Sequence, residues 1–194
     1  MEALRGAGSL SIRQIREWGE ILTGFETRNA YEVDNGTSGQ PLFRAEEEGG
    51  SFFVRHFLKA LRPFTLSVYG MDGTLAFQVS RPFRFYFHQV EVTAADGTPL
   101  GSVQRKFCLL RRIYNVFDAA GRRRLELFGP ILRPWTFHIR RGDEKFGRIS
   151  KKWSGIGKEM FSDADNFGAE FPPDWDPNLK AVLLGAVFLV DFVH

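Results

Sequence analysis

Five short polar turns, each between two apolar segments rich in β-forming residues, constrain the fold of this chain more than any other feature. Such turns combine Gly with Asp, Asn or basic residues, and they suit the positive φ that joins two strands into a hairpin. The five segments read YEVDNGTSGQPLF, SVYGMDGTLAFQV, EVTAADGTPLGSV, NVFDAAGRRRLEL and HIRRGDEKFGRI. They predict about ten strands connected as a meander.

The strand segments alternate apolar and polar side chains, which is typical of a sheet with one buried face. In FRFYFHQVEV, the residues Phe83, Phe85 and Phe87 fall on one face. In RRLELFG, the residues Leu125 and Leu127 fall on one face. About ten strands with short turns avoid exposed edges either by stacking as two sheets or by closing into a barrel.

Two helices are expected. A weak one is predicted from Ser11 to Gly19, with Ser11 as its cap. The other contains the longest apolar run, the ten residues from Ala181 to Val190, and Asp176 and Pro177 before it suit an N-cap and a first helical residue. At about 1.5 Å per residue the run extends about 15 Å, half of a hydrocarbon core of about 30 Å.

The C-terminal helix has two interpretations, a membrane helix or a plug inside a wide barrel. The residues assigned to it in either case are Lys180, Ala181, Val182, Leu183, Leu184, Gly185, Ala186, Val187, Phe188, Leu189 and Val190. A helix that is apolar all round must be surrounded on every side, and this one is short for a membrane span and is followed by Asp191. We favour the plug, with Gly185 and Ala186 allowing strands to approach closely.

Length, charge and cysteine content narrow the remaining choices. The 194 residues suit a flexible N-terminus at 1–9 and a single domain at 10–194. A net charge of +3 and a pI of about 9.2 mildly favour anionic partners. One cysteine, Cys108, and no secretory signal indicate a cytoplasmic protein or one peripheral to the cytoplasmic face of a membrane. No phosphate loop, nucleophile elbow or metal-ligand spacing occurs, so we expect no enzyme.

The acidic segment SDADNFGAEFPPDWD, residues 162–176, invites comparison with a twelve-residue calcium loop. Counted from its first aspartate, the ligand positions hold Asp163, Asp165, Phe167, the carbonyl of Ala169, Phe171 and Asp174. Three of five side-chain ligands are carboxylates, which predicts at best a weak Ca²⁺ site with a dissociation constant on the order of 10⁻⁴ to 10⁻³ M. The alternative is an acidic turn whose phenylalanines, Phe161, Phe167 and Phe171, anchor it to the core.

Basic residues gather near several of the predicted turns. One group is Arg140, Arg141, Lys145, Arg148, Lys151 and Lys152, and other groups lie at 105–112 and 122–124. Such residues are either simply solvated or, if several share one face, form a patch for anionic lipid. No zinc spacing, helix-turn-helix or RNA-binding aromatic motif accompanies them, which argues against nucleic acid as a partner.

Two segments carry a resemblance to a known family. These are LTGFETRNAYEV at 22–33 and GRISKKWSGIGKEMFSDADNFGAEFPPDWDPNLKAVLLGAVFLVDF at 147–192, and together they resemble the phospholipid scramblase family. That family is related to the tubby-like fold, so the resemblance implies a mainly β protein, a closed antiparallel barrel of about twelve strands wrapped around a hydrophobic C-terminal helix. It also implies a calcium segment at 163–174 and a membrane helix at 180–192.

The resemblance leaves two functional hypotheses. The first is ATP-independent, calcium-dependent movement of phospholipids between bilayer leaflets, in which cation binding at 163–174 loosens the hold on the helix. The second is a soluble tubby-like module that binds anionic lipid such as a phosphoinositide, or a protein partner, and moves no lipid. A compact barrel with a filled interior offers no hydrophilic path through a membrane, which favours the second hypothesis on physical grounds. The family resemblance favours the first, which we predict, with the second as its alternative.

Overall fold

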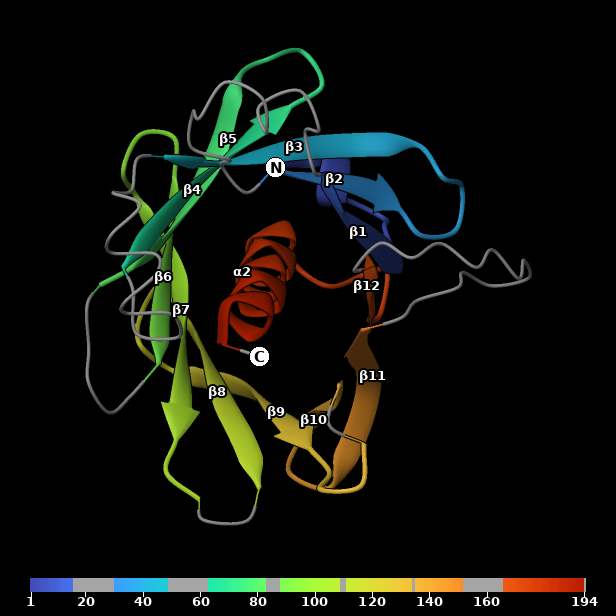
Figure 1. Cartoon of the computed structure of the whole chain (residues 1–194), viewed down its shortest axis with the longest axis vertical. Coiled ribbons are helices and arrows are strands. Elements are labelled where there is room, and N and C mark those ends of the chain that lie inside the picture. Colours follow the sequence, from blue (N-terminus) through green and yellow to red (C-terminus); the bar gives the residue numbers. More distant parts are fainter. Residues whose placement is uncertain are drawn as a thin grey trace, which may run out of the picture.

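The chain folds as a closed antiparallel β-barrel wrapped around one C-terminal helix, as Figure 1 shows for the computed structural model. The structure describes residues 1–15, 30–48, 63–82, 88–108, 111–133, 135–151 and 166–193. Within these ranges there are twelve strands: β1 (Ser9–Ile15), β2 (Ala30–Asn35), β3 (Pro41–Glu48), β4 (Phe64–Gly70), β5 (Leu75–Arg81), β6 (Gln89–Ala94), β7 (Pro99–Lys106), β8 (Arg112–Asp118), β9 (Arg123–Gly129), β10 (Thr136–Arg141), β11 (Glu144–Lys151) and β12 (Asn166–Glu170). The predicted fold class is confirmed.

Each strand pairs with its sequence neighbours, and β1 closes the barrel by pairing with both β2 and β12. All five predicted turns join consecutive strands. In the turn between β6 and β7, Gly97 has a φ of 84°. This left-handed conformation is strained for most residues and costs glycine little, so the turn requires a glycine there. Closure leaves no sheet edge, which decides between the stacked and closed arrangements that the turns alone permitted.

Side chains alternate between the barrel interior and its outer face. In β9 the predicted pattern is confirmed, since Leu125 and Leu127 are buried while Arg124 is exposed and Glu126 only partly covered. The matching prediction for Phe83, Phe85 and Phe87 lies outside the described residues. Inward valines, leucines and aromatic residues from nearly every strand join the helix in one hydrophobic core.

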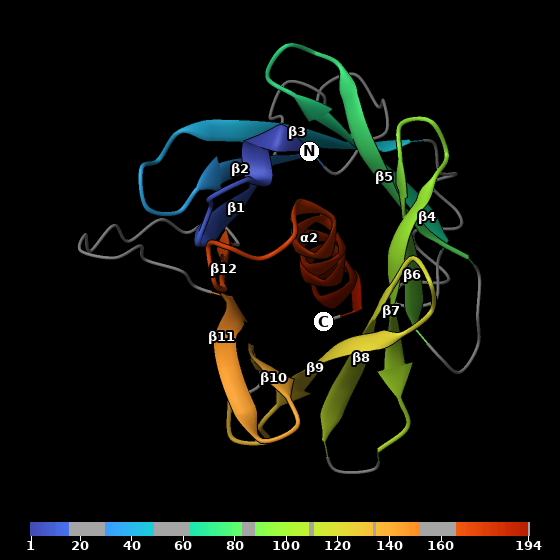
Figure 2. The same cartoon turned by 180° about the vertical axis from the view of Figure 1, so that it is seen from behind.

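The helix α2 (Pro177–Val193) lies inside the ring of strands, and Figure 2 shows it enclosed from the opposite side as well. Asp176 caps it, because its carboxylate accepts the N–H groups of Asn178 at 2.7 Å and Leu179 at 3.4 Å. All residues of the predicted plug, 180–190, are buried. The helix packs chiefly against β6 and β7. The plug interpretation therefore describes this structure.

One sequence prediction is wrong. The helix expected from Ser11 to Gly19 is a strand as far as Ile15, and its remaining positions lie outside the described residues. Leu10 and Ile12 point into the core while Arg13 is exposed, which is the two-residue period of a strand. Pairing of β1 with β2 and β12 completes the barrel. The stabilisation from this pairing outweighs the weak local preference for a helix capped by Ser11.

The N-terminal residues also pack against the barrel. A short 3₁₀ helix, η1 (Glu2–Leu4), contacts α2, and Leu4 is buried. Burial does not measure motion, so the flexible segment at 1–9 and the domain boundary at residue 10 stay predictions.

The two ends of the barrel differ. One end, called here the turn mouth, carries the five short turns and the start of α2 at Pro177. The other end, called the loop mouth, carries the connections β7–β8 and β9–β10 and the end of α2 at Val193. The helix therefore runs from the turn mouth to the loop mouth.

Candidate functional site

The feature with the clearest functional potential is the set of contacts that hold α2 inside the barrel. At the turn mouth, the Nζ of Lys180 donates hydrogen bonds to the carbonyl of Leu4 at 3.0 Å and that of Pro173 at 2.7 Å. The side chain of Lys180 is 0% exposed, and its ammonium lies 5.6 Å from the ring centroid of Phe171. This one cation therefore ties the helix to the N-terminal segment and to the segment before the helix.

Burial destabilises the charged form of Lys180, because the ammonium loses its hydration. Desolvation lowers the pKa of Lys180, while the nearby carboxylates of Asp174 and Asp176 oppose that shift. Hydrogen bonds to two carbonyls replace part of the lost hydration. The strength of the tie at the turn mouth thus depends on negative charge at Asp174, one of the residues of the predicted calcium segment.

A second tie holds the other end of the helix at the loop mouth. The hydroxyl of Tyr31 donates to the carboxylate of Asp191 at 2.7 Å, and the Nζ of Lys151 lies 3.9 Å from the same carboxylate. The ring of Phe192 stacks on that of Phe64, with 4.0 Å between centroids. The acidic residue that ends the apolar run is therefore a polar contact of the plug with β2 and β11.

Between the two ties the helix is held by close apolar packing. A Cβ added at Gly185 would lie 2.9 Å from Val92 Cγ2 of β6, so only glycine leaves room for this approach. The prediction that Gly185 lets a strand come close is confirmed. One turn further along the helix, the ring of Phe188 lies 5.0 Å from that of Tyr31. The middle of the helix is thus fixed by shape and the two ends by polar groups.

Only part of the predicted calcium segment is described. Asp163 and Asp165 lie outside the described residues. Of the rest, Phe167 and Ala169 belong to β12, and their side chains are buried, as is that of Phe171. The burial of these two phenylalanines agrees with the anchoring expected of them, while the third, Phe161, lies outside the described residues. Asp174 is exposed in the turn that leads into α2.

The described part of the segment offers little for a cation. Strand β12 pairs with β1 and β11, so the backbone around Ala169 is extended and engaged on both sides, unlike a calcium loop. Among the residues that the structure describes, no three His, Cys, Asp or Glu side chains gather in a way that would hold a metal ion. The calcium site stays a prediction that depends on Asp163 and Asp165.

The predicted lipid patch lies on the β10–β11 hairpin, except for Lys152, which lies outside the described residues. Several of its cations have anionic partners. Arg140 pairs with Glu126 at 3.2 Å and Arg148 with Glu170 at 3.0 Å, while Lys151 belongs to the tie at Asp191. Arg141 packs over the ring of Phe146, and Lys145 is exposed. The net charge of this hairpin is therefore smaller than its sequence indicates, and the lipid patch stays a prediction.

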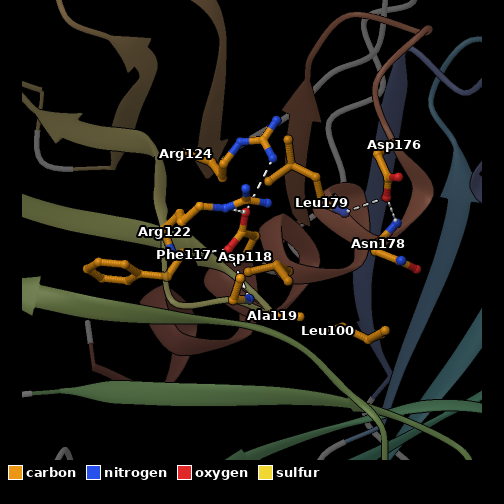
Figure 3. A pocket seen from close by; sticks show the side chains of 11 residues that line it. Leu100, Phe117, Asp118, Ala119, Arg122, Arg124, Asp176, Asn178 and Leu179 are labelled. Atoms are coloured by element: carbon orange, nitrogen blue, oxygen red, sulfur yellow. Dashed lines mark hydrogen bonds and ion pairs between the residues drawn. The ribbon is translucent and has the colours of Figure 1, made fainter.

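A cavity of about 310 Å³ opens beside the first turn of α2, at the turn mouth (Figure 3). Its apolar wall is formed by Leu100, Phe117, Leu179 and Val182. Its polar rim is formed by Asp118, Arg122, Arg124, Asp176 and Asn178. The cavity therefore has room for a small amphipathic group in contact with the start of the plug.

The rim of this cavity is held by its own ion pairs. Asp118 accepts from the Nε of Arg122 at 3.0 Å and from the Nη1 of Arg124 at 3.4 Å, and also from the backbone N–H groups of Ala120 and Arg122. Hydrogen bonding, first from the backbone of Arg122, lowers the pKa of Asp118. These partners hold the β8–β9 turn in place and leave little uncompensated charge for a ligand.

Some of these residues are marked by a pattern in the sequence, and others are not. Lys180 and Asp191 are the polar residues that bound the apolar run, so their position alone marks them as ends of the plug. Their partners, Leu4 and Tyr31, lie 176 and 160 residues away along the chain. No local pattern predicts such contacts.

The fold and the buried helix together define a class, the closed β-barrels filled by a C-terminal helix. Comparison with known sequences makes this specific: the chain belongs to the Scramblase family, whose family model matches residues 1–194. It is 35% identical over 209 residues to phospholipid scramblase 1 of Mus musculus and 34% identical over 212 residues to phospholipid scramblase 2 of Bos taurus. It is 34% identical over 207 residues to human phospholipid scramblase family member 5.

These alignments cover 100% of this chain, which spans 62%, 70% and 76% of the three relatives respectively. No solved structure matches the chain at a significant level. The described helices include none that is long and apolar enough to cross a membrane.

Proposed function

We propose that this chain is a phospholipid scramblase, which moves phospholipids between bilayer leaflets under calcium control and without ATP. The observation that carries the proposal is the match of residues 1–194 to the Scramblase family, with relatives named phospholipid scramblases at 34–35% identity. Lipid movement of this kind makes and breaks no covalent bond, so the protein would not be an enzyme in the chemical sense.

The ties on α2 supply a physical route for calcium control. The carbonyl of Pro173 and the negative charge of Asp174 both act on Lys180 at the start of the helix. A cation bound at 163–174 would take up the charge of Asp174 and repel the ammonium of Lys180, and both effects weaken the tie. Loosening the tie would let the apolar helix leave the barrel and meet a bilayer.

The second hypothesis, a module that binds anionic lipid or a protein partner without moving lipid, has one observation in its favour. Helix α2 fills the barrel interior along residues 180–190, all of which are buried. A filled barrel offers no polar path for a lipid headgroup. On this hypothesis the cations of the β10–β11 hairpin would contact the headgroups.

Reconstitution separates the two hypotheses. The protein is placed in liposomes that contain a fluorescent phospholipid in both leaflets, and dithionite is added outside with and without calcium, in the absence of ATP. A scramblase exposes the inner-leaflet lipid to quenching when calcium is present. Inner-leaflet fluorescence that stays protected under both conditions would contradict the proposal and leave the binding module as the better account.

The predicted calcium segment is tested in the same assay. An Asp163→Ala, Asp165→Ala double variant should lose calcium-dependent quenching and the heat of calcium binding in calorimetry. Equal heats and equal quenching in the variant and the unmodified protein would remove the site while leaving lipid movement itself intact.

A further inference from the structure

The loop mouth carries a surface that the sequence did not predict. We propose that this surface, here called the apolar rim and made of Phe107, Ile131, Leu132 and Trp135, docks onto a bilayer of anionic phospholipid. The proposal goes beyond lipid movement, because docking requires neither calcium nor release of the helix.

Exposure singles out these residues. Five large hydrophobic side chains are exposed in the described part of the chain, and four of them belong to the apolar rim. Leu132 is 93% exposed and Phe107 is 78% exposed. The fifth, Met71, lies in the β4–β5 turn at the opposite end of the barrel. A cluster of exposed apolar side chains at one end of a protein marks an interaction site, whereas single ones do not.

The strand register places the two connections that carry these four residues at the same end of the barrel. Lys106 at the end of β7 pairs with Ile113 of β8, and Arg112 of β8 pairs with Gly129 at the end of β9. The connections that carry Phe107 and Leu132 therefore leave neighbouring strands at the same end. Neighbouring strands lie about 4.8 Å apart, so the ends of β7 to β10 span only about 15 Å.

The apolar rim is flanked by cations. Residues 105–112 contain Arg105, Lys106, Arg111 and Arg112 and no carboxylate, and residues 129–136 contain Arg133 and no carboxylate. In the described part of the structure no carboxylate forms an ion pair with any of these five. Apolar side chains that protrude among cations with no ion-pair partner in the described residues suit a bilayer interface. The apolar groups would enter the acyl boundary, and the cations would meet anionic headgroups.

The tryptophan of the rim has the geometry of an interfacial anchor. Trp135 is 36% exposed, its carbonyl accepts the backbone N–H of Lys151 at 2.9 Å, and the Lys151 ammonium lies 5.0 Å from its ring centroid. Tryptophan prefers the headgroup level of membranes, since one part of its ring system is apolar and another part donates a hydrogen bond. Lys151 also reaches Asp191 of α2, so the rim adjoins the tie at the loop mouth.

The apolar rim and the predicted lipid patch differ in how many of their cations form ion pairs. On the β10–β11 hairpin, Arg140 and Arg148 are paired with glutamates, whereas the cations around the rim are not paired with any described carboxylate. At the loop mouth, four exposed apolar side chains also accompany the cations, so docking there would gain both hydrophobic and electrostatic free energy. Docking by this end would bring the Val193 end of α2 to the bilayer.

The test is co-sedimentation of the full chain with phosphatidylcholine vesicles, with and without phosphatidylserine, in calcium-free buffer. We expect binding only with phosphatidylserine. Phe107→Ala and Leu132→Ala should each weaken it about tenfold, because each removes most of an apolar side chain that would leave water. The matched control is Met71→Ala, which removes a comparably exposed apolar side chain from the opposite mouth and should leave binding unchanged.

Charge is tested by a second matched pair. Lys106→Glu at the loop mouth should weaken vesicle binding about fivefold or more. This effect of the substitution should be smaller at high salt, which screens the charges. Lys145→Glu makes the same change in net charge on the β10–β11 hairpin and should have little effect. All of these side chains are exposed, so the variants should fold normally.

Three results would overturn the proposal. If the unmodified chain stays in solution with phosphatidylserine vesicles, the rim is a contact for a protein instead. If Met71→Ala weakens binding as much as Leu132→Ala, the apolar rim has no special part in it. If Lys145→Glu is the more damaging charge reversal, the β10–β11 hairpin is the lipid surface. If the protein binds vesicles but inner-leaflet lipid stays protected from dithionite, the proposed lipid movement is contradicted. The proposed docking surface is then still supported.

Discussion

A disulfide between α2 and β6 would show whether the helix has to leave the barrel. The positions are Gly185 and Val92, each replaced by cysteine in a Cys108→Ser background that removes the one native thiol. A Cβ at Gly185 would lie 2.9 Å from Val92 Cγ2, the position that a cysteine sulfur would occupy. With an S–S bond of about 2.04 Å, a disulfide places the Cβ of one cysteine about 3 Å from the sulfur of the other, so the geometry fits.

The size of the effect follows from the length of chain that the bond encloses. Positions 92 to 185 enclose about 94 residues, and the chain-entropy estimate for such a loop is about 4.7 kcal/mol at 25 °C. A chain of this size gains about 2–4 °C in melting temperature for each kcal/mol, so oxidation should raise the melting temperature by about 9–19 °C. This shift reports that the bond has formed, independently of any lipid assay.

The decisive measurement is dithionite quenching of reconstituted protein in calcium, before and after reduction. We expect the oxidised double variant to leave inner-leaflet lipid protected and the reduced one to expose it. The single variants Gly185→Cys and Val92→Cys, treated with the same oxidant, should be equally active in both states. An oxidised double variant that moves lipid as fast as the reduced one would refute release of the helix as the step that calcium controls.

Three further predictions concern how the helix is held. Asp176→Ala removes the N-cap and should lower the free energy of unfolding by about 1 kcal/mol in denaturant titrations, whereas removal of the exposed carboxylate in Asp174→Ala should change it less. Phe188→Ala, which opens a space beside Tyr31, should cost about 3–5 kcal/mol, and a loss below 1 kcal/mol would mean that the barrel collapses onto the smaller side chain. Burial lowers the pKa of Lys180 below its ordinary 10.5, so the unfolded chain binds more protons between the two values and stability should rise with pH there. Lys180→Met should reduce this rise of stability with pH. If the slope of stability against pH is unchanged in the variant, the rise is caused by other groups.

Local patterns were sufficient for most of the fold. Polar turns with glycine, such as that at Gly97, predicted the hairpins, and alternation in segments such as 123–129 predicted which side chains point inward. Asp176 and Pro177 correctly marked the start of α2. The apolar circumference of the helix predicted that it is enclosed, because no face is suited to water.

Long-range contacts explain what the sequence could not show. Ser11 has the local character of a helix cap, but residues 9–15 form the strand that closes the barrel, a role set by pairing with β12 more than 150 residues away. The tie of Lys180 to Leu4 and that of Asp191 to Tyr31 likewise depend on distant segments. The apolar rim could not be predicted from the sequence, because the connections that carry Phe107 and Leu132 come to the same end of the barrel only through the register of β7 to β9.

The two proposals, release of the helix and docking of the loop mouth, support each other energetically. The barrel interior and a hydrocarbon core both exclude water, so transfer of the apolar helix between them changes its hydrophobic free energy little. Emptying the barrel costs more free energy, because inward residues such as Val79 and Val92 would become exposed to water. Exposure of apolar surface costs about 25 cal/mol per Å². Release in solution is therefore opposed even when the tie at Lys180 is weakened. A loop mouth seated on a bilayer removes that opposition, since acyl chains can then cover the surface that the helix leaves.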